Sequence, residues 1–140
     1  MNSLTHFSRL AGVFLVLLIG AASFSSAAHA ADEGSTWTKR YQKIHGTWKI
    51  VETDEGRFLE LNEKFKTRRA PDLKLFLSPR LDADVTPDNA VAGSVLIAKL
   101  KKAKGAQRYA LPADLDLNDF ETLVLHCEQY TKLWGVSPLR

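Results

Sequence analysis

The clearest hydrophobic pattern in the chain lies at residues 73–78, where leucine occupies every second position from Leu73 to Leu77. A period of two residues is typical of a β-strand with one face in the core, so we expect the leucine face to be buried. Similar short apolar segments are separated by turn residues such as Asp54, Gly56 and Pro79. These further predicted strands are residues 45–52, 57–62, 95–98, 109–111, 120–127 and 130–134.

Residues 90–103 are the one segment in which a helix competes with a strand, because several apolar positions there approximate helical spacing. Gly93 disfavours the helix by up to about 1 kcal/mol relative to alanine, so we expect a strand. Short strands at these intervals, without an internal repeat, predict an all-β protein with a single small β-sandwich of mainly antiparallel strands. We expect this domain at residues 44–140. Residues 31–43 are polar apart from Trp37 and Tyr41 and are expected to form a flexible arm.

The apolar run at residues 10–22 follows Arg9 and precedes small residues that end in Ala28-His29-Ala30. This arrangement predicts a signal peptide at residues 1–30, cleaved after Ala30. The run falls short of the roughly 20 apolar residues that span a bilayer, and no later segment reaches that length, so no transmembrane segment is expected after cleavage. We therefore expect an exported protein, either periplasmic or secreted.

Charge and cysteine content limit the classes of partner. The formal net charge of +3 is too small to favour nucleic-acid binding, and Cys127 is the only cysteine, so no intrachain disulfide can form. Two basic clusters occur at residues 64–69 and 99–108. They are interpreted as solvated turns that protect sheet edges, with contact to lipid headgroups or another polyanion as the alternative.

No motif for metal or catalytic chemistry is complete. Residues 114–119 resemble the start of a calcium loop, but Asp119 occupies the required glycine position and Leu125 the position of the bidentate glutamate. His45, His126 and Cys127 lack the spacing of a transition-metal site. There is no Gly-x-Ser-x-Gly elbow and no glycine-rich phosphate loop. The sequence therefore predicts no metal, no cofactor on this chain and no enzymatic activity.

Another set of residues forms a recognisable pattern along the chain: Gly46, residues 71–78, Lys101, Gly105, Gln107, Tyr109, Leu111, Pro112, Phe120, Val124, Leu125, Cys127 and Gly135. In the order and spacing of these residues, the chain from about residue 44 to residue 139 resembles the DM-thirteen domain family, also called the electron-transfer DM-thirteen domain. The resemblance implies a redox role for the single cysteine near the domain's end, which Cys127 matches. It also implies a partner, because the family often accompanies haem-binding DOMON and cytochrome modules; here that would be another exported or membrane-bound redox protein. His126 departs from the family, which usually has tryptophan there.

Three hypotheses remain open from the sequence. In the first, Cys127 lies at a functional face of a non-enzymatic exported module with a thiol-redox or electron-transfer accessory role. In the second, the module is structural or adhesive, and Cys127 is a small buried hydrophobe beside Leu123 and Leu125. In the third, the sandwich binds a ligand near aromatic side chains that either line a pocket or fill the core. Those aromatic residues are Tyr109, Tyr130 and Trp134.

Overall fold

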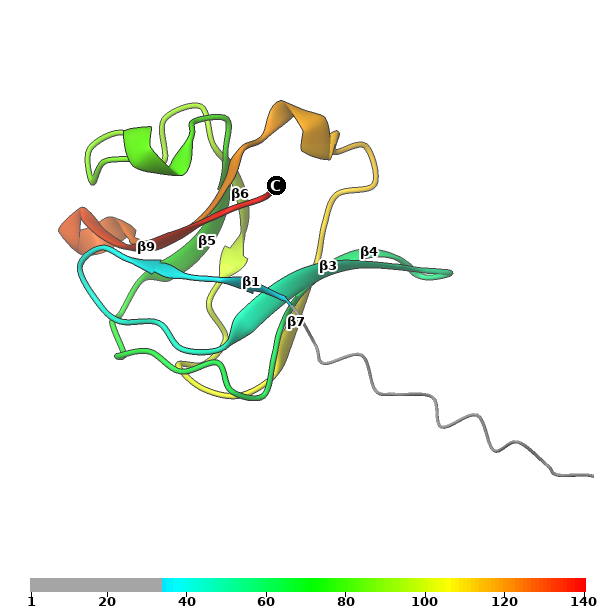
Figure 1. Cartoon of the computed structure of the whole chain (residues 1–140), viewed down its shortest axis with the longest axis horizontal. Coiled ribbons are helices and arrows are strands. Elements are labelled where there is room, and N and C mark those ends of the chain that lie inside the picture. The colour runs from blue at the N-terminus through cyan, green and yellow to red at the C-terminus, as the bar shows by residue number, and fades with distance from the viewer. Residues whose placement is uncertain (1–33) are drawn as a thin grey trace, which may run out of the picture.

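Residues 34–140, which we describe from a computed structural model of the protein, form two antiparallel sheets (Figure 1). The expected signal peptide lies outside the described residues. One sheet has the order β1-β3-β4-β7, with β1 (Ser35–Thr36), β3 (Thr47–Thr53), β4 (Gly56–Leu61) and β7 (Gln107–Ala110). The other has the order β2-β9-β8-β5-β6, with β2 (Thr38–Lys39), β9 (Lys132–Pro138), β8 (Thr122–Cys127), β5 (Leu73–Ser78) and β6 (Val95–Lys99). The predicted all-β fold is confirmed.

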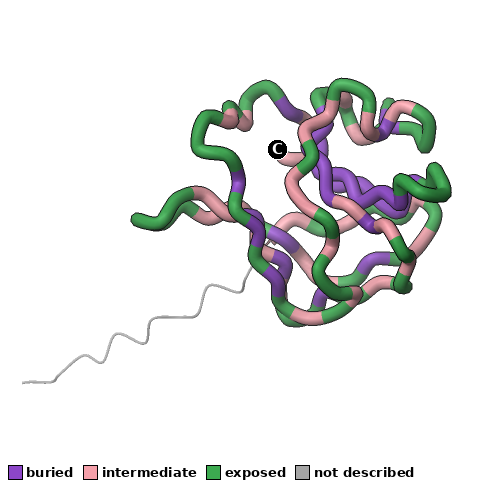
Figure 2. Tube along the Cα trace, turned by 180° about the vertical axis from the view of Figure 1, so that it is seen from behind, coloured by how far each residue is buried: buried purple, intermediate pink, exposed green. Residues whose placement is uncertain are grey.

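The main core lies between the two sheets. Leu75 and Leu77 of β5 and Leu125 of β8 are fully shielded from solvent, and they belong to the same apolar cluster as Trp48 and Leu59 of the four-stranded sheet. Figure 2 shows the buried residues running through the paired strands, while exposed residues concentrate in the loops. The leucine face of residues 73–78 is therefore buried as its alternation predicts.

The opposite face of β5 is buried as well, which corrects the expectation of a half-buried strand. Phe76 is 5% exposed and belongs to a second apolar cluster with Val124 and Val136. The cover comes from the long polar connection between β5 and β6, which contains the short 3-10 helix η1 (Asp82–Asp84) and contributes Val85 and Ala90 to the cluster. A loop that is polar in composition thus places two small apolar side chains over the sheet.

The expectation of a flexible arm does not hold for residues 34–43. Strand β1 pairs with β3, and β2 pairs with β9, so this segment adds one strand to each sheet. Trp37, between the two strands, packs against the main core, with its ring centroid 6.5 Å from that of Phe65. The Ser137 hydroxyl donates a hydrogen bond to the Thr36 carbonyl at 2.6 Å. One aromatic anchor and backbone pairing are thus enough to order a segment of polar composition.

The strand prediction for residues 95–98 is confirmed by β6, the edge strand of the five-stranded sheet. Its pairing with β5 shifts register between Leu75 and Phe76, which marks a β-bulge or irregularity. Glycine at position 93 adopts a φ of +71°, in the left-handed region that a continuous helix cannot use. Gly93 is the last residue of a turn, and β6 (Val95–Lys99) begins two residues later.

Candidate functional site

Cys127 ends β8 on the face that points into the main core. It pairs with Leu73 of β5 and Lys132 of β9, and its side chain is fully shielded from solvent together with those of Leu123 and Leu125. The thiol is free, and it is buried. A reactive cysteine needs partial exposure and an electropositive neighbourhood, whereas Cys127 has apolar neighbours. The arrangement matches the prediction that Cys127 shares the apolar face of its strand.

His126 lies on the other face of β8, as strand alternation requires. It pairs with Lys74 of β5, is only 2% exposed, and its Nδ1 atom has no hydrogen-bond partner within residues 34–140. Burial lowers the pKa of His126 below its ordinary value, while the charge of Glu128 acts in the opposite direction. The histidine and the thiol therefore point to opposite sides of the sheet and cannot form a thiolate-imidazole pair in this conformation.

Near His126, two lysines and two carboxylates form ion pairs with one another. Lys74 forms ion pairs with Glu128 and, at 3.3 Å, with Asp72, and Lys99 lies 3.8 Å from the second oxygen of Asp72. These carboxylates raise the pKa of Lys74, with the hydrogen bond to Glu128 as the largest cause. The two carboxylates are thus held by lysines rather than by the imidazole.

We expect the buried imidazole to make the fold sensitive to mild acid. Because its pKa is lowered on folding, the unfolded chain binds a proton more readily, and the free energy of unfolding should fall as the pH drops below the unfolded value of about 6.5. Urea unfolding between about pH 7 and pH 5 measures this loss. His126→Leu should remove it, whereas His45→Gln, at an exposed histidine, should retain it. The same slope in both variants would contradict the assignment to His126.

The three aromatic residues predicted near a pocket do not converge on one. Tyr109 and Trp134 fill the main core at 3% and 5% exposure, whereas Tyr130 is 58% exposed in the 3-10 helix η3 (Glu128–Tyr130). The Nε1 atom of Trp134 donates a hydrogen bond to the Thr67 hydroxyl at 2.9 Å. None of the three lines any of the larger hollows described for residues 34–140.

Tyr109 instead holds the loop between β6 and β7. Its hydroxyl accepts a hydrogen bond from the Lys101 amide at 3.0 Å and donates one to the Gln107 side chain at 2.7 Å. Gln107 in turn accepts from the Lys102 amide and donates to the carbonyls of Lys102 and Gly105. Burial is the largest cause that raises the pKa of Tyr109. The family pattern in the sequence includes Lys101, Gly105, Gln107 and Tyr109, but it does not reveal the hydrogen-bond network that they form with Lys102.

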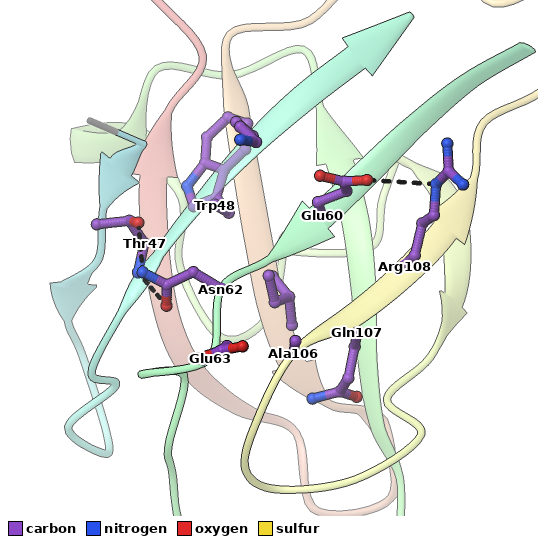
Figure 3. A pocket seen from close by; sticks show the side chains of 10 residues that line it. Thr47, Trp48, Glu60, Asn62, Glu63, Ala106, Gln107 and Arg108 are labelled. Atoms are coloured by element: carbon purple, nitrogen blue, oxygen red, sulfur yellow. Dashed lines mark hydrogen bonds and ion pairs between the residues drawn. The ribbon is translucent and has the colours of Figure 1, made fainter. Parts of the chain in front are cut away.

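The largest of four hollows described on residues 34–140 lies on the four-stranded sheet, and Cys127 does not line it (Figure 3). It has a volume of about 500 Å³, and polar side chains of β3, β4 and β7 surround it. Arg108 forms an ion pair with Glu60 at 3.3 Å, and the Asn62 side chain bonds the Thr47 hydroxyl and backbone amide. Two of the charged groups that line it, Arg108 and Glu60, are thus paired with each other rather than free for a ligand.

The segment that resembles a calcium loop is a capped turn. Asp116 precedes the 3-10 helix η2 (Leu117–Asp119), and its carboxylate accepts hydrogen bonds from the backbone and side-chain nitrogens of Asn118, each at 2.9 Å. Across residues 34–140, no group of three or more His, Cys, Asp or Glu side chains is placed to hold a metal ion. In the same part of the chain, no helix has the length and apolar character needed to cross a membrane.

Residues 34–140 form a small β-sandwich module with a buried thiol in its core. A family model with the description Electron transfer DM13 matches residues 36–139, and the chain belongs to this family. The match confirms the resemblance and extends it to Thr36, so it includes the strands of the N-terminal arm. Neither a curated protein nor a solved structure matches the chain.

Proposed function

We propose that the protein is an exported, non-enzymatic module that assists electron transfer by binding a redox protein on another polypeptide, and that Cys127 serves it as a core residue. Membership of the Electron transfer DM13 family supports the redox context. The burial of Cys127 carries its assignment as a core residue. Thiol-disulfide exchange requires direct contact between a thiolate and a disulfide sulfur of the partner, and a buried thiol does not allow that contact.

The surroundings of the thiol support a packing role. Leu123 and Leu125 occupy the same face of β8, and Leu73 lies opposite Cys127 on β5. All three leucines are at most 3% exposed. A thiol in such a place behaves as a small hydrophobe, and its contribution is the apolar surface it buries. The module then contributes binding surface rather than a redox group of its own.

One observation favours a second candidate, a thiol-redox role that depends on local opening. Cys127 is followed at once by η3, whose residues are exposed, and Thr131 closes this turn with a φ of 49°. A β-branched residue in the left-handed region is strained, and such strain often accompanies switch segments. Opening of this turn would bring the sulfur from the core to the surface.

Thiol labelling tests both candidates on the protein recovered from the extracytoplasmic fraction. Mass spectrometry should first show an N-terminus at Ala31, as cleavage after Ala30 requires.

Dithionitrobenzoate should then label the native protein slowly and the denatured protein at once, and glutathione disulfide should form no adduct with the native state. Rapid native labelling at neutral pH would support the redox candidate instead. An intact Met1 form in the membrane fraction would contradict export by cleavage.

A further inference from the structure

Two basic clusters that are separated in sequence meet at one end of the sandwich, the lower edge in Figure 1. The His45 and Lys66 backbones exchange both of their hydrogen bonds, at 2.9 and 3.2 Å, and Lys66 also pairs with Lys104. The second pairing is flanked by bonds from Thr67 to Ala103 and from Gly105 to Phe65. Directly opposed residues project their side chains to the same face about 5 Å apart. The structure therefore places His45, Lys66 and Lys104 in one row.

Three features fix this row in place. Glycine at position 46 has a φ of +83°, and a Cβ there would lie 2.5 Å from the Phe65 amide nitrogen. Only glycine therefore allows the segments around residues 46 and 65 to approach this closely. Phe65, next to Lys66, is 1% exposed and anchors its chain in the main core. The buried Gln107 and Tyr109 side chains hold the neighbouring loop from beneath. The two lysines of this row are thus held on a rigid support.

The charge at this end is unbalanced. We define the basic end as residues 43–46, 62–69 and 100–105; they contain eight lysines and arginines, all exposed, and a single acid, Glu63. None of the eight forms an ion pair with any acid of residues 34–140, whereas lysines and arginines elsewhere on the sandwich, such as Lys74 and Arg57, do. Like charges directly opposite each other destabilise a sheet. A bound polyanion would relieve that repulsion.

We propose that the basic end docks on an anionic phospholipid surface. Clusters of four to eight lysines and arginines are typical of surfaces that bind anionic lipid headgroups. Protein interfaces, by contrast, are depleted of lysine and rely on aromatic and arginine anchors. The basic end contains six lysines and two arginines, and none of the large exposed apolar side chains of residues 34–140 lies in it. Binding is therefore electrostatic and does not insert side chains into the bilayer.

Vesicle binding of the exported protein tests the proposal. It should bind mixed vesicles of phosphatidylglycerol and phosphatidylcholine and show little binding to vesicles of phosphatidylcholine alone. Binding to the phosphatidylcholine vesicles would report a charge-independent contribution, including any from residues 1–33. Raising the ionic strength from about 0.1 M to 1 M shortens the Debye length from about 10 Å to 3 Å and should release the protein. Each basic residue near an anionic surface contributes about fivefold, so Lys66→Gln with Lys104→Gln should weaken binding about 25-fold.

The matched control is Arg57→Gln with Arg140→Gln, which removes the same formal charge from residues that form ion pairs away from the basic end. It should bind nearly as well as the unaltered protein. The Lys66 and Lys104 variant should keep an equal or higher thermal midpoint, because a like-charge contact is removed. Lys64→Gln with Arg68→Gln provides a second variant with the same expected loss. Equal binding to neutral vesicles, equal loss in the control, or tighter binding to polyglutamate than to anionic vesicles would overturn the proposal.

Discussion

Replacing Cys127 with serine should lower the free energy of unfolding by about 1–3 kcal/mol. The sulfur is fully shielded among leucines, and no hydrogen bond to it is formed in residues 34–140, so the serine hydroxyl would be buried without a partner. Urea denaturation measures the change, and an unchanged m-value would show that the unfolded state is unaffected.

Cys127→Ala separates the polar cost from the loss of volume. Cys127→Ala leaves a smaller cavity than the truncation of a methionine or leucine to alanine would, and it buries no polar group. It should therefore be less damaging than Cys127→Ser. If the serine and alanine variants both unfold at the urea concentration of the unaltered protein, the sulfur does not contribute to the core. That outcome would remove the main support for Cys127 as a packing residue.

Gly46→Ala should be the more damaging change, with a loss of about 3 kcal/mol or more in the free energy of unfolding. The backbone at this position has a φ of +83°, which alanine adopts only with strain. In addition, the new Cβ would lie 2.5 Å from the Phe65 nitrogen and 2.7 Å from its Cα, neither of which is a flexible group. Thermal or urea unfolding measures the combined cost.

Gly93→Ala is the matched control for Gly46→Ala. Its φ is +71°, but a Cβ there would meet no atom within 4 Å. It should therefore cost only the conformational strain, about 1–2 kcal/mol. The difference between the two variants measures the close approach of residues 44–47 to residues 62–65. Equal losses would mean that this approach adjusts freely, and the rigid support inferred for the basic end would then be wrong.

Local patterns predict the strands well because each strand carries its own signal. The alternation of residues 73–78 matches β5 at both ends, and β8 lies within the apolar run of residues 120–127. The two strands of the arm could not be predicted in this way, because each has only two residues and is too short to show a hydrophobic period. Trp37 was the available signal, since a large aromatic side chain in a polar segment usually finds a core to pack against.

The candidate site was predicted less completely than the fold. Alternation correctly places Cys127 with Leu123 and Leu125, because it depends only on neighbouring positions in one strand. The pairing of Lys66 with Lys104 depends on how two loops, each of which connects the two sheets, approach each other, and no local pattern encodes that. A glycine forced into the left-handed region can be located only after its neighbours in space are known.

The N-terminal arm also determines where the folding unit begins. Strand β1 pairs with β3 at one edge of the four-stranded sheet, and β2 pairs with β9 at one edge of the five-stranded sheet. A chain that started at residue 44 would leave both edges with unpaired backbone amides and carbonyls, and would remove Trp37 from the core. Unpaired edges are templates for pairing with other chains, so shortened forms should self-associate through two surfaces and grow into open assemblies rather than closed dimers.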